Sequence, residues 1–326
     1  MPELFAATGD AIAHIVPEGD EWAVSLALAG KAVQCLALDP HHPGTVYAGT
    51  RGHGVWKSGD GGRTWADLRL PERDVFSLAL SPADGALYAG CEPSRLLVSR
   101  DGGGTWRELA ALRRLPSAPH WSFPPRPWTS HVSAIAPSPH DAGLLLVGIE
   151  LGGLMRSADG GASWADHRPG AQRDVHALAW HRKAPGRAYE AGGGGAAWSA
   201  DGGATWRPAD AGRDRDYTWA LAVDPGDPER WYVSASPGPR RAHDPGIGAQ
   251  AAIYRWRGAG PWEALGGGLP EPLDAMPYAL ACVPGWLFAG LGDGRIYVSR
   301  DGGDTWRAMG LRGDRLAHVR ALACTA

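Results

Sequence analysis

One eight-residue phrase occurs five times in the chain and constrains the fold more than any other feature. Each copy reads Ser-x-Asp-Gly-Gly-x-Thr/Ser-Trp. Repetition of this kind indicates that similar structural units follow one another along the chain. The copies span residues 58–65, 99–106, 157–164, 199–206 and 299–306.

The chemistry of the phrase is that of a tight turn between two strands. Each copy follows a short apolar run, such as 54–57 or 295–298, that is typical of a strand. The paired glycines permit positive φ, and the Asp carboxylate can accept backbone N–H groups within the turn. We therefore interpret the carboxylates as turn-formers rather than catalytic groups. They are Asp60, Asp101, Asp159, Asp201 and Asp301.

The phrase closely resembles the Asp-box, or BNR, repeat of sialidases, xyloglucan-degrading glycoside hydrolases, sortilin-type receptors and a photosystem II assembly factor. The resemblance implies a β-propeller. It also implies that each box lies at the outer turn between the third and fourth strands of a blade, away from the binding face. The motif thus indicates a fold and leaves the chemistry open.

A second phrase allows the blades to be counted. It is an apolar run whose fifth residue is always Ala, and it predicts the innermost strand of each blade. The box tryptophan has two further echoes, at Trp22 and Trp262, which brings the tryptophan positions to seven. The predicted inner strands begin at Val33, Val75, Val132, Val175, Thr218, Pro277 and Val319.

We therefore predict an all-β, seven-bladed propeller that occupies residues 1–326 as a single domain. The C-terminal strand should pair with the N-terminal blade, which closes the ring and removes open sheet edges. The predicted blades are 319–326 with 3–22, then 33–65, 75–106, 132–164, 175–206, 218–262 and 277–306.

The composition of the chain limits the classes of partner, cofactor and cellular location that we expect. The net charge is −3 and no basic block exists, which argues against nucleic acid. No apolar run is long enough to span a membrane, and the N-terminus resembles no secretory signal, so we expect a cytoplasmic protein. The four cysteines lack metal-binding spacing. Cys35 and Cys324 could approach each other, but we expect free thiols. We predict no metal and no cofactor.

Two insertions point to the functional face. Two intervals in the tryptophan series are longer than the rest, and the extra residues fall in 107–131 and 234–251. By strand order both loops belong to one face, and long loops in compact domains are often functional. We expect a wall or lid over the channel mouth. Candidate ligand-binding residues here are Trp121, Trp128, His131, Arg240 and His243.

The second position of each inner strand varies, whereas its neighbours are uniformly apolar. Variation at one position of a repeat is typical of contact with an asymmetric ligand. The alternative is that these side chains fill gaps between blades. Around the ring the residues are Arg320, Gln34, Phe76, Ser133, His176, Trp219 and Tyr278.

One carboxylate breaks the pattern of the second strands. Glu190 stands where other blades have a small or apolar residue, and a buried carboxylate is costly unless it is paired or used. Glu150 stands at the mouth of the next loop in the adjacent blade, and Arg51 occupies a comparable loop elsewhere.

These residues support a glycan-active pocket as the first hypothesis. Glycoside hydrolysis needs two carboxylates, for which Glu150 and Glu190 are the candidates, with His176 and Tyr278 as proton-transfer groups. A lyase that uses His176, Tyr278 and an Arg, or a non-catalytic glycan binder, would use the same pocket. The Arg triad, Tyr/Glu pair and Asp of sialidases have no match here, and the two-propeller xyloglucan hydrolases are about twice as long.

Two other classes remain open. The first is a non-catalytic scaffold that holds a protein partner, as the resemblance to the single-propeller photosystem II assembly factor implies. The short Arg240-Arg241 pair and Arg213 with Arg215 are its nearest features. The second is a metal-dependent small-molecule enzyme. Its histidines would come from one face: His120, His131, His176 and His243.

Overall fold

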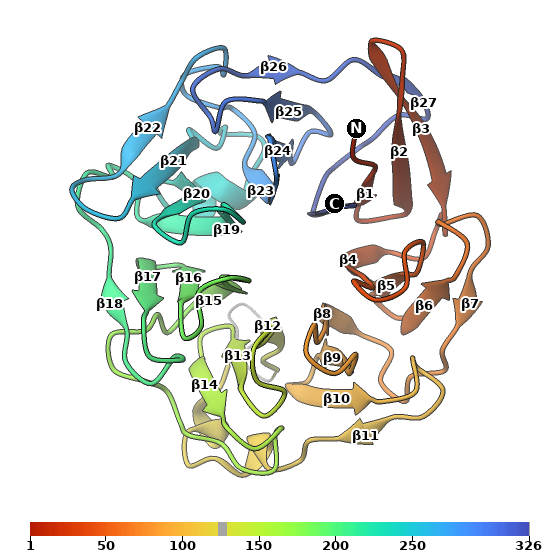
Figure 1. Ribbon diagram of the computed structural model, residues 1–326, viewed down its shortest axis with the longest axis vertical. Helices are drawn as coiled ribbons and strands as arrows, with labels where there is room; N and C mark the ends of the chain where they lie inside the picture. Colours follow the sequence, from red (N-terminus) through yellow and green to blue (C-terminus); the bar gives the residue numbers. More distant parts are fainter. Residues whose placement is uncertain (123–128, 326) are drawn as a thin grey trace.

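The repeats assemble into a ring. The computed structural model describes residues 1–122 and 129–325, and these form seven twisted sheets around a central channel (Figure 1). Trp128, one of the predicted ligand-binding residues, lies outside the described residues. Among those described, no helix is long and apolar enough to cross a membrane.

Blades two to four follow the predicted order from the channel outward. The fourth blade has three strands, and an isolated bridge between Arg156 and Ala165 replaces its outer strand. The strands are β4 (Val33–Leu38), β5 (Val46–Thr50), β6 (Val55–Ser58) and β7 (Ala66–Asp67); β8 (Val75–Leu80), β9 (Leu87–Cys91), β10 (Arg95–Ser99) and β11 (Arg107–Glu108); and β12 (Val132–Pro137), β13 (Leu145–Ile149) and β14 (Gly153–Ser157).

Blades five to seven have four strands each. Short helices occur only in the two insertions, as far as residues 1–122 and 129–325 show: η1 (Leu112–Arg114), η2 (Ala118–His120) and α1 (Pro239–His243). The strands are β15 (Val175–Trp180), β16 (Ala188–Gly192), β17 (Gly195–Ser199) and β18 (Arg207–Pro208); β19 (Tyr217–Val223), β20 (Arg230–Ser236), β21 (Ala252–Arg257) and β22 (Glu263–Leu265); and β23 (Pro277–Val283), β24 (Trp286–Leu291), β25 (Ile296–Ser299) and β26 (Arg307–Ala308).

The first blade joins the two ends of the chain, as predicted. It contains β1 (Leu4–Ala7), β2 (Ile12–Glu18) and β3 (Glu21–Ala27), with β28 (Ala321–Cys324) as its innermost strand. β28 pairs antiparallel with β1, and the two termini lie side by side (Figure 1). β27 (Leu311–Gly313) adds a parallel strand outside β3. This pairing leaves the ring without an open edge at the channel.

The Asp-boxes form the predicted turns. In the second blade, Ser58 Oγ donates to Asp60 Oδ1 at 2.8 Å, while Thr64 N and Thr64 Oγ1 donate to the two carboxylate oxygens at 2.9 and 2.6 Å. The same side-chain hydrogen bonds recur in the other four boxes. They lower the pKa of each Asp, to about 2 for Asp301, where the Thr305 hydroxyl contributes most. The structural interpretation of these carboxylates is therefore confirmed.

Four second strands carry glycine where they meet the next inner strand, which lets those blades approach closely; the glycines are Gly49, Gly90, Gly148 and Gly290. A Cβ added to Gly90 would lie 2.6 Å from Val132 Cγ1, and one added to Gly148 would lie 2.4 Å from Val175 Cγ1. Real side-chain atoms do not pack this closely, so only glycine fits at this separation. The first residue of the inner-strand phrase thus packs into the space that the preceding blade's glycine leaves.

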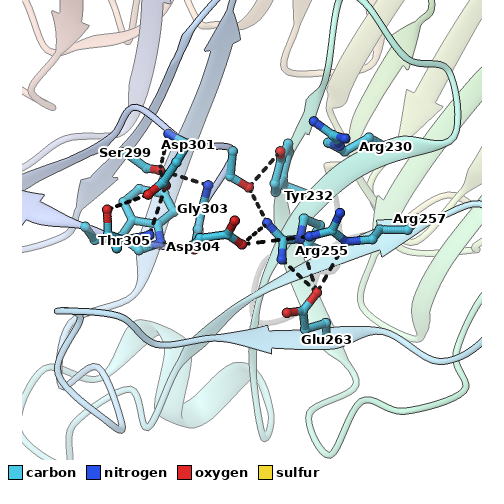
Figure 2. A network of polar contacts seen from close by, with 12 residues as sticks. Arg230, Tyr232, Arg255, Arg257, Glu263, Ser299, Asp301, Gly303, Asp304 and Thr305 are labelled. Atoms are coloured by element: carbon cyan, nitrogen blue, oxygen red, sulfur yellow. Dashed lines mark hydrogen bonds and ion pairs between the residues drawn. The ribbon is translucent and has the colours of Figure 1, made fainter.

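The Asp-boxes also accept hydrogen bonds from neighbouring blades at the outer rim of the propeller. A cation on the third strand of one blade donates to the carbonyl of the first box glycine in the next: Lys57 to Gly102, Arg156 to Gly202 and Arg255 to Gly302. Figure 2 shows the last case, in which Arg255 also forms ion pairs with Glu263 at 2.8 Å and Asp304 at 2.7 Å. We call these three contacts the rim clasps.

Candidate functional site

A repeated β-bulge builds the channel mouth. In six blades the register between the inner and second strands shifts at the variable position of the inner strand. A bulge leaves a residue unpaired, bends the strand and re-aims the side chain. The residues within these shifts are Gln34, Phe76, Ser133, His176, Trp219 and Tyr278.

These six residues and Arg320 line one cavity of about 1160 Å³ at the mouth of the channel. The seventh, Arg320, immediately precedes β28, and its backbone N–H donates to Ala7 O at 2.8 Å. The variable ring of the sequence is therefore a ring in space, with one member from each blade. Arg51, Glu92, His131, Glu150, His243 and His318 also line this cavity.

One corner of the cavity combines carboxylates with imidazoles. Glu150 directly follows β13, and His131 directly precedes β12 on the adjacent strand of the same blade. The distance from His131 Nε2 to Glu150 Oε2 is 2.5 Å, and both side chains are almost fully buried. His131 also stacks on Phe76, with ring centroids 3.9 Å apart. Ion pairing and stacking together fix the position of the Glu150 carboxylate.

Asp174 and His176 belong to the next blade and complete this corner. His176 Nδ1 donates to the carbonyl of Thr218 at 2.6 Å, which directs Nε2 toward Asp174 Oδ2 at 3.4 Å. One ligand atom each from Glu150, Asp174 and His176 lies within 4.8 Å of the others. These three residues are called the acid–imidazole cluster below.

An aromatic wall adjoins the acid–imidazole cluster, because the Trp219 ring lies 4.3 Å from the His176 ring. The Trp219 ring lies 5.5 Å from Tyr278 and 4.9 Å from His243, both in edge-on geometry. Tyr278 Oη donates to Ala242 O at 2.6 Å, so His243 Nδ1 donates to Tyr278 Oη at 2.9 Å and Nε2 accepts from Tyr217 Oη at 2.8 Å. This chain fixes one neutral tautomer of His243 and anchors helix α1 to the wall.

The environment of Tyr278 bears on its predicted proton-transfer role. Burial raises its pKa to about 12, and its hydroxyl is engaged with α1. His318 stacks on Tyr278 at 5.1 Å, and burial, together with Arg320, lowers the pKa of His318 to about 4. Both groups are therefore neutral near pH 7.

The two insertions differ in what they contribute. Arg241, Ala242 and His243 of the second insertion line the cavity, in keeping with the expected wall. In the first insertion His131 also lines the cavity, whereas Leu112 and Leu115 pack into the core between the third and fourth blades.

Three predicted site residues lie away from the cavity lining: Glu190, Trp121 and Arg240. Glu190 is fully buried in β16, and its Oε2 accepts the Gln172 N–H at 2.9 Å. Trp121 packs beside the core of the third and fourth blades and donates to Ser117 Oγ at 3.0 Å. The predicted pair of Glu150 and Glu190 is thus not brought together in one cavity.

Sequence reasoning missed Asp174, Tyr217 and His318. Asp174 and His318 immediately precede the predicted inner-strand phrase, and so does Tyr217. The signal available was therefore positional, since His131, a predicted site residue, also directly precedes such a phrase.

A profile of the BNR/Asp-box repeat matches residues 297–308. The chain is a β-propeller that carries BNR/Asp-box repeats. A search of curated proteins finds no match. Among solved structures the fold is similar to that of an ancestral GH74 enzyme, with a TM-score of 0.65, 17% identity and coverage of 93% of this chain and 40% of that one.

Two further structural neighbours have different sizes. The GH74 xyloglucanase from Xanthomonas campestris gives a TM-score of 0.66 at 21% identity, with coverage of 85% of this chain and 45% of that one. YCF48 bound to D1 peptide gives 0.56 at 18% identity, with coverage of 85% and 80%. The BNR/Asp-box propeller described here thus spans less than half the length of these two GH74 enzymes, and the likeness concerns the fold alone.

Proposed function

We propose that the channel mouth of this propeller binds a small polyhydroxylated ligand of the carbohydrate class. The observation that carries the proposal is the convergence of one variable residue from every blade on a single cavity. Within it, the half-buried rings of Phe76 and Trp219 contribute apolar lining, while Glu150 and Arg320 contribute polar groups. Aromatic faces combined with a few convergent polar groups are typical of ligand pockets, and they match the two kinds of surface a sugar ring offers.

The proposal is limited to binding. The carboxylates predicted for glycoside hydrolysis, Glu150 and Glu190, do not share the cavity, and the hydroxyl of Tyr278 is engaged with α1. Ligand recognition does not require Glu150, Glu190 or Tyr278 to transfer a proton.

We also propose a cytoplasmic location, supported by the four cysteines, which are all free thiols.

A panel of neutral and acidic oligosaccharides, titrated into the full chain and followed by tryptophan fluorescence and calorimetry, tests the proposal. Trp219→Ala should weaken binding by at least about tenfold, because a desolvated stacking face is worth on the order of 1.4 kcal/mol. Trp198→Ala is the matched control: that indole is also half-buried but lies under Arg187 rather than in the cavity. Equal losses in both variants, or no binding to any member of the panel, would refute the proposal.

A protein-binding scaffold is the second candidate, favoured by the coverage of 80% of YCF48, which was solved with a bound D1 peptide. The arginines expected for that role are largely engaged internally. Arg213 pairs with Asp210, and Arg215 pairs with Asp214 and donates to Tyr254. A pull-down with the wild type and with a variant in which residues 234–251 are shortened distinguishes the two candidates. If the protein is a scaffold, the wild type should retain a protein partner in the presence of sugar, and the shortened variant should lose that partner.

A further inference from the structure

We propose that the acid–imidazole cluster of Glu150, Asp174 and His176 is a binding site for a divalent transition cation, Zn²⁺ or Mn²⁺. The site stands on its own contacts and does not depend on carbohydrate binding. It uses one donor from the end of the fourth blade's second strand and two from the start of the fifth blade's inner strand.

His176 is oriented as metal-ligating histidines are. Its side chain is fully buried, and Nδ1 donates to the Thr218 carbonyl at 2.6 Å. Metal-ligating histidines almost always donate their other ring N–H in this way, which fixes the tautomer and leaves a lone pair on the ligating nitrogen. Here that nitrogen is Nε2, and it has no hydrogen-bond partner among the described residues.

The spacing of the donor atoms fits a single cation. His176 Nε2 and Asp174 Oδ2 are 3.4 Å apart, longer than a good hydrogen bond. Two ligands about 2.1 Å from one tetrahedral cation lie about 3.4 Å from each other. All three donor atoms lie within 4.8 Å of one another, close to the about 4.2 Å that opposite ligands of one cation span, so small side-chain movements are enough to close the site.

The surroundings of the two carboxylates also suit a bound cation. Glu150 is held by His131 at 2.5 Å, a carboxylate–imidazole contact of the kind that orients ligating carboxylates. Asp174 Oδ1 is buried and lacks a hydrogen-bond partner within the described part of the chain. A cation would compensate the two adjacent carboxylates, which otherwise repel each other.

The donor set favours particular metals. Two carboxylates and one imidazole suit Zn²⁺ and Mn²⁺ better than Ca²⁺, which takes six to eight oxygen ligands. Three protein ligands leave coordination positions open. Glu150 and His176 line the cavity, so an open position would be reachable from the channel mouth.

Calorimetric titration of the tag-free, EDTA-treated full chain with ZnCl₂, with MnCl₂ and, for comparison, with CaCl₂ tests the assignment. We expect one site per chain, and we expect Asp174→Asn and His176→Gln each to weaken it by at least about tenfold. Asp274→Asn, a cavity carboxylate outside the cluster, is the matched control and should bind as the wild type does.

Several results would overturn the assignment. They are absence of Zn²⁺ or Mn²⁺ binding to the wild type at millimolar concentration, preference for Ca²⁺, or equal affinity in wild type and Asp174→Asn. If Asp174→Asn fails to fold by circular dichroism, Glu150→Gln replaces it with the same expected loss. Oligosaccharide titration of the EDTA-treated protein is scored separately, so failure of the cation site and failure of the carbohydrate proposal give different results.

Discussion

Replacing Glu190 with Gln should make the protein more stable at neutral pH and remove part of its pH dependence. The Glu190 side chain is completely buried, and its Oε1 has no hydrogen-bond partner among the described residues. Burial raises its pKa from the ordinary value near 4.5 to about 8, against a smaller opposing effect of the Gln172 N–H. Glutamine keeps the oxygen that accepts this N–H and has nearly the same shape, but it carries no charge.

The direction of the pH dependence of stability follows from proton binding to Glu190 in the folded and unfolded states. Between pH 4.5 and 8 the folded chain holds a proton on Glu190 that the unfolded chain has released, so stability is full at low pH and falls as pH rises. Each pH unit corresponds to about 1.4 kcal/mol, so the cost near pH 7 is about 3 kcal/mol. Below pH 4.5 this contribution to the pH dependence disappears.

The assay is urea denaturation of wild type and Glu190→Gln at pH 5.5, 7.0 and 8.5. The difference in unfolding free energy between the two proteins should grow in favour of Gln as pH rises, while titrations common to both cancel. Glu21→Gln, at a side chain 56% exposed, should show a constant difference. A Glu190→Gln profile that runs parallel to the wild type would refute the assignment of a buried, protonated carboxyl. Ligand binding at the channel mouth should not change.

Three further substitutions test the rim and the blade contacts by denaturant midpoint. Asp301→Ala removes the acceptor of the Thr305 N–H and hydroxyl and should cost about 1–3 kcal/mol without changing ligand binding. Arg255→Met, which removes a rim clasp, should cost a similar about 1–3 kcal/mol. Gly148→Ala places a Cβ 2.4 Å from Val175 Cγ1 and should cost about 1–3 kcal/mol, whereas Gly59→Ala, with no atom within 4 Å, should be nearly neutral.

The fold was predictable because its signals are local. Ser58, Asp60 and Thr64 satisfy one another within a single turn, so the sequence phrase and the structure report the same hydrogen bonds. Closure of the ring was also predictable, since Leu4–Ala7 has the pattern of a second strand and lacks an inner strand before it. Both predictions required only the repeat as a reference.

The site was predictable only in part, because it depends on contacts between blades. Variation at the second position of the inner strands identified His176 and Trp219. It did so because a β-bulge recurs at that position in six blades and directs each variable side chain to the same cavity. Asp174 was missed because its proximity to Glu150 arises between two blades, so its position before the inner-strand phrase does not by itself indicate the contact. Glu190 was noticed as an exception to its repeat, but the exception alone could not indicate that its partner would be the Gln172 backbone.

The second insertion, residues 234–251, determines how far the cavity is pre-organised for a ligand. A loop of this length could close over a bound molecule, yet α1 is already tied to the channel through His243, which bridges Tyr217 and Tyr278. Moving α1 away from its position would break these hydrogen bonds and the edge-on contact between His243 and Trp219. A pre-organised wall spares the ligand the entropy of ordering the loop. The aromatic side of the cavity should therefore be nearly the same with and without ligand, and selectivity should arise from the fixed position of the Trp219 ring against His176.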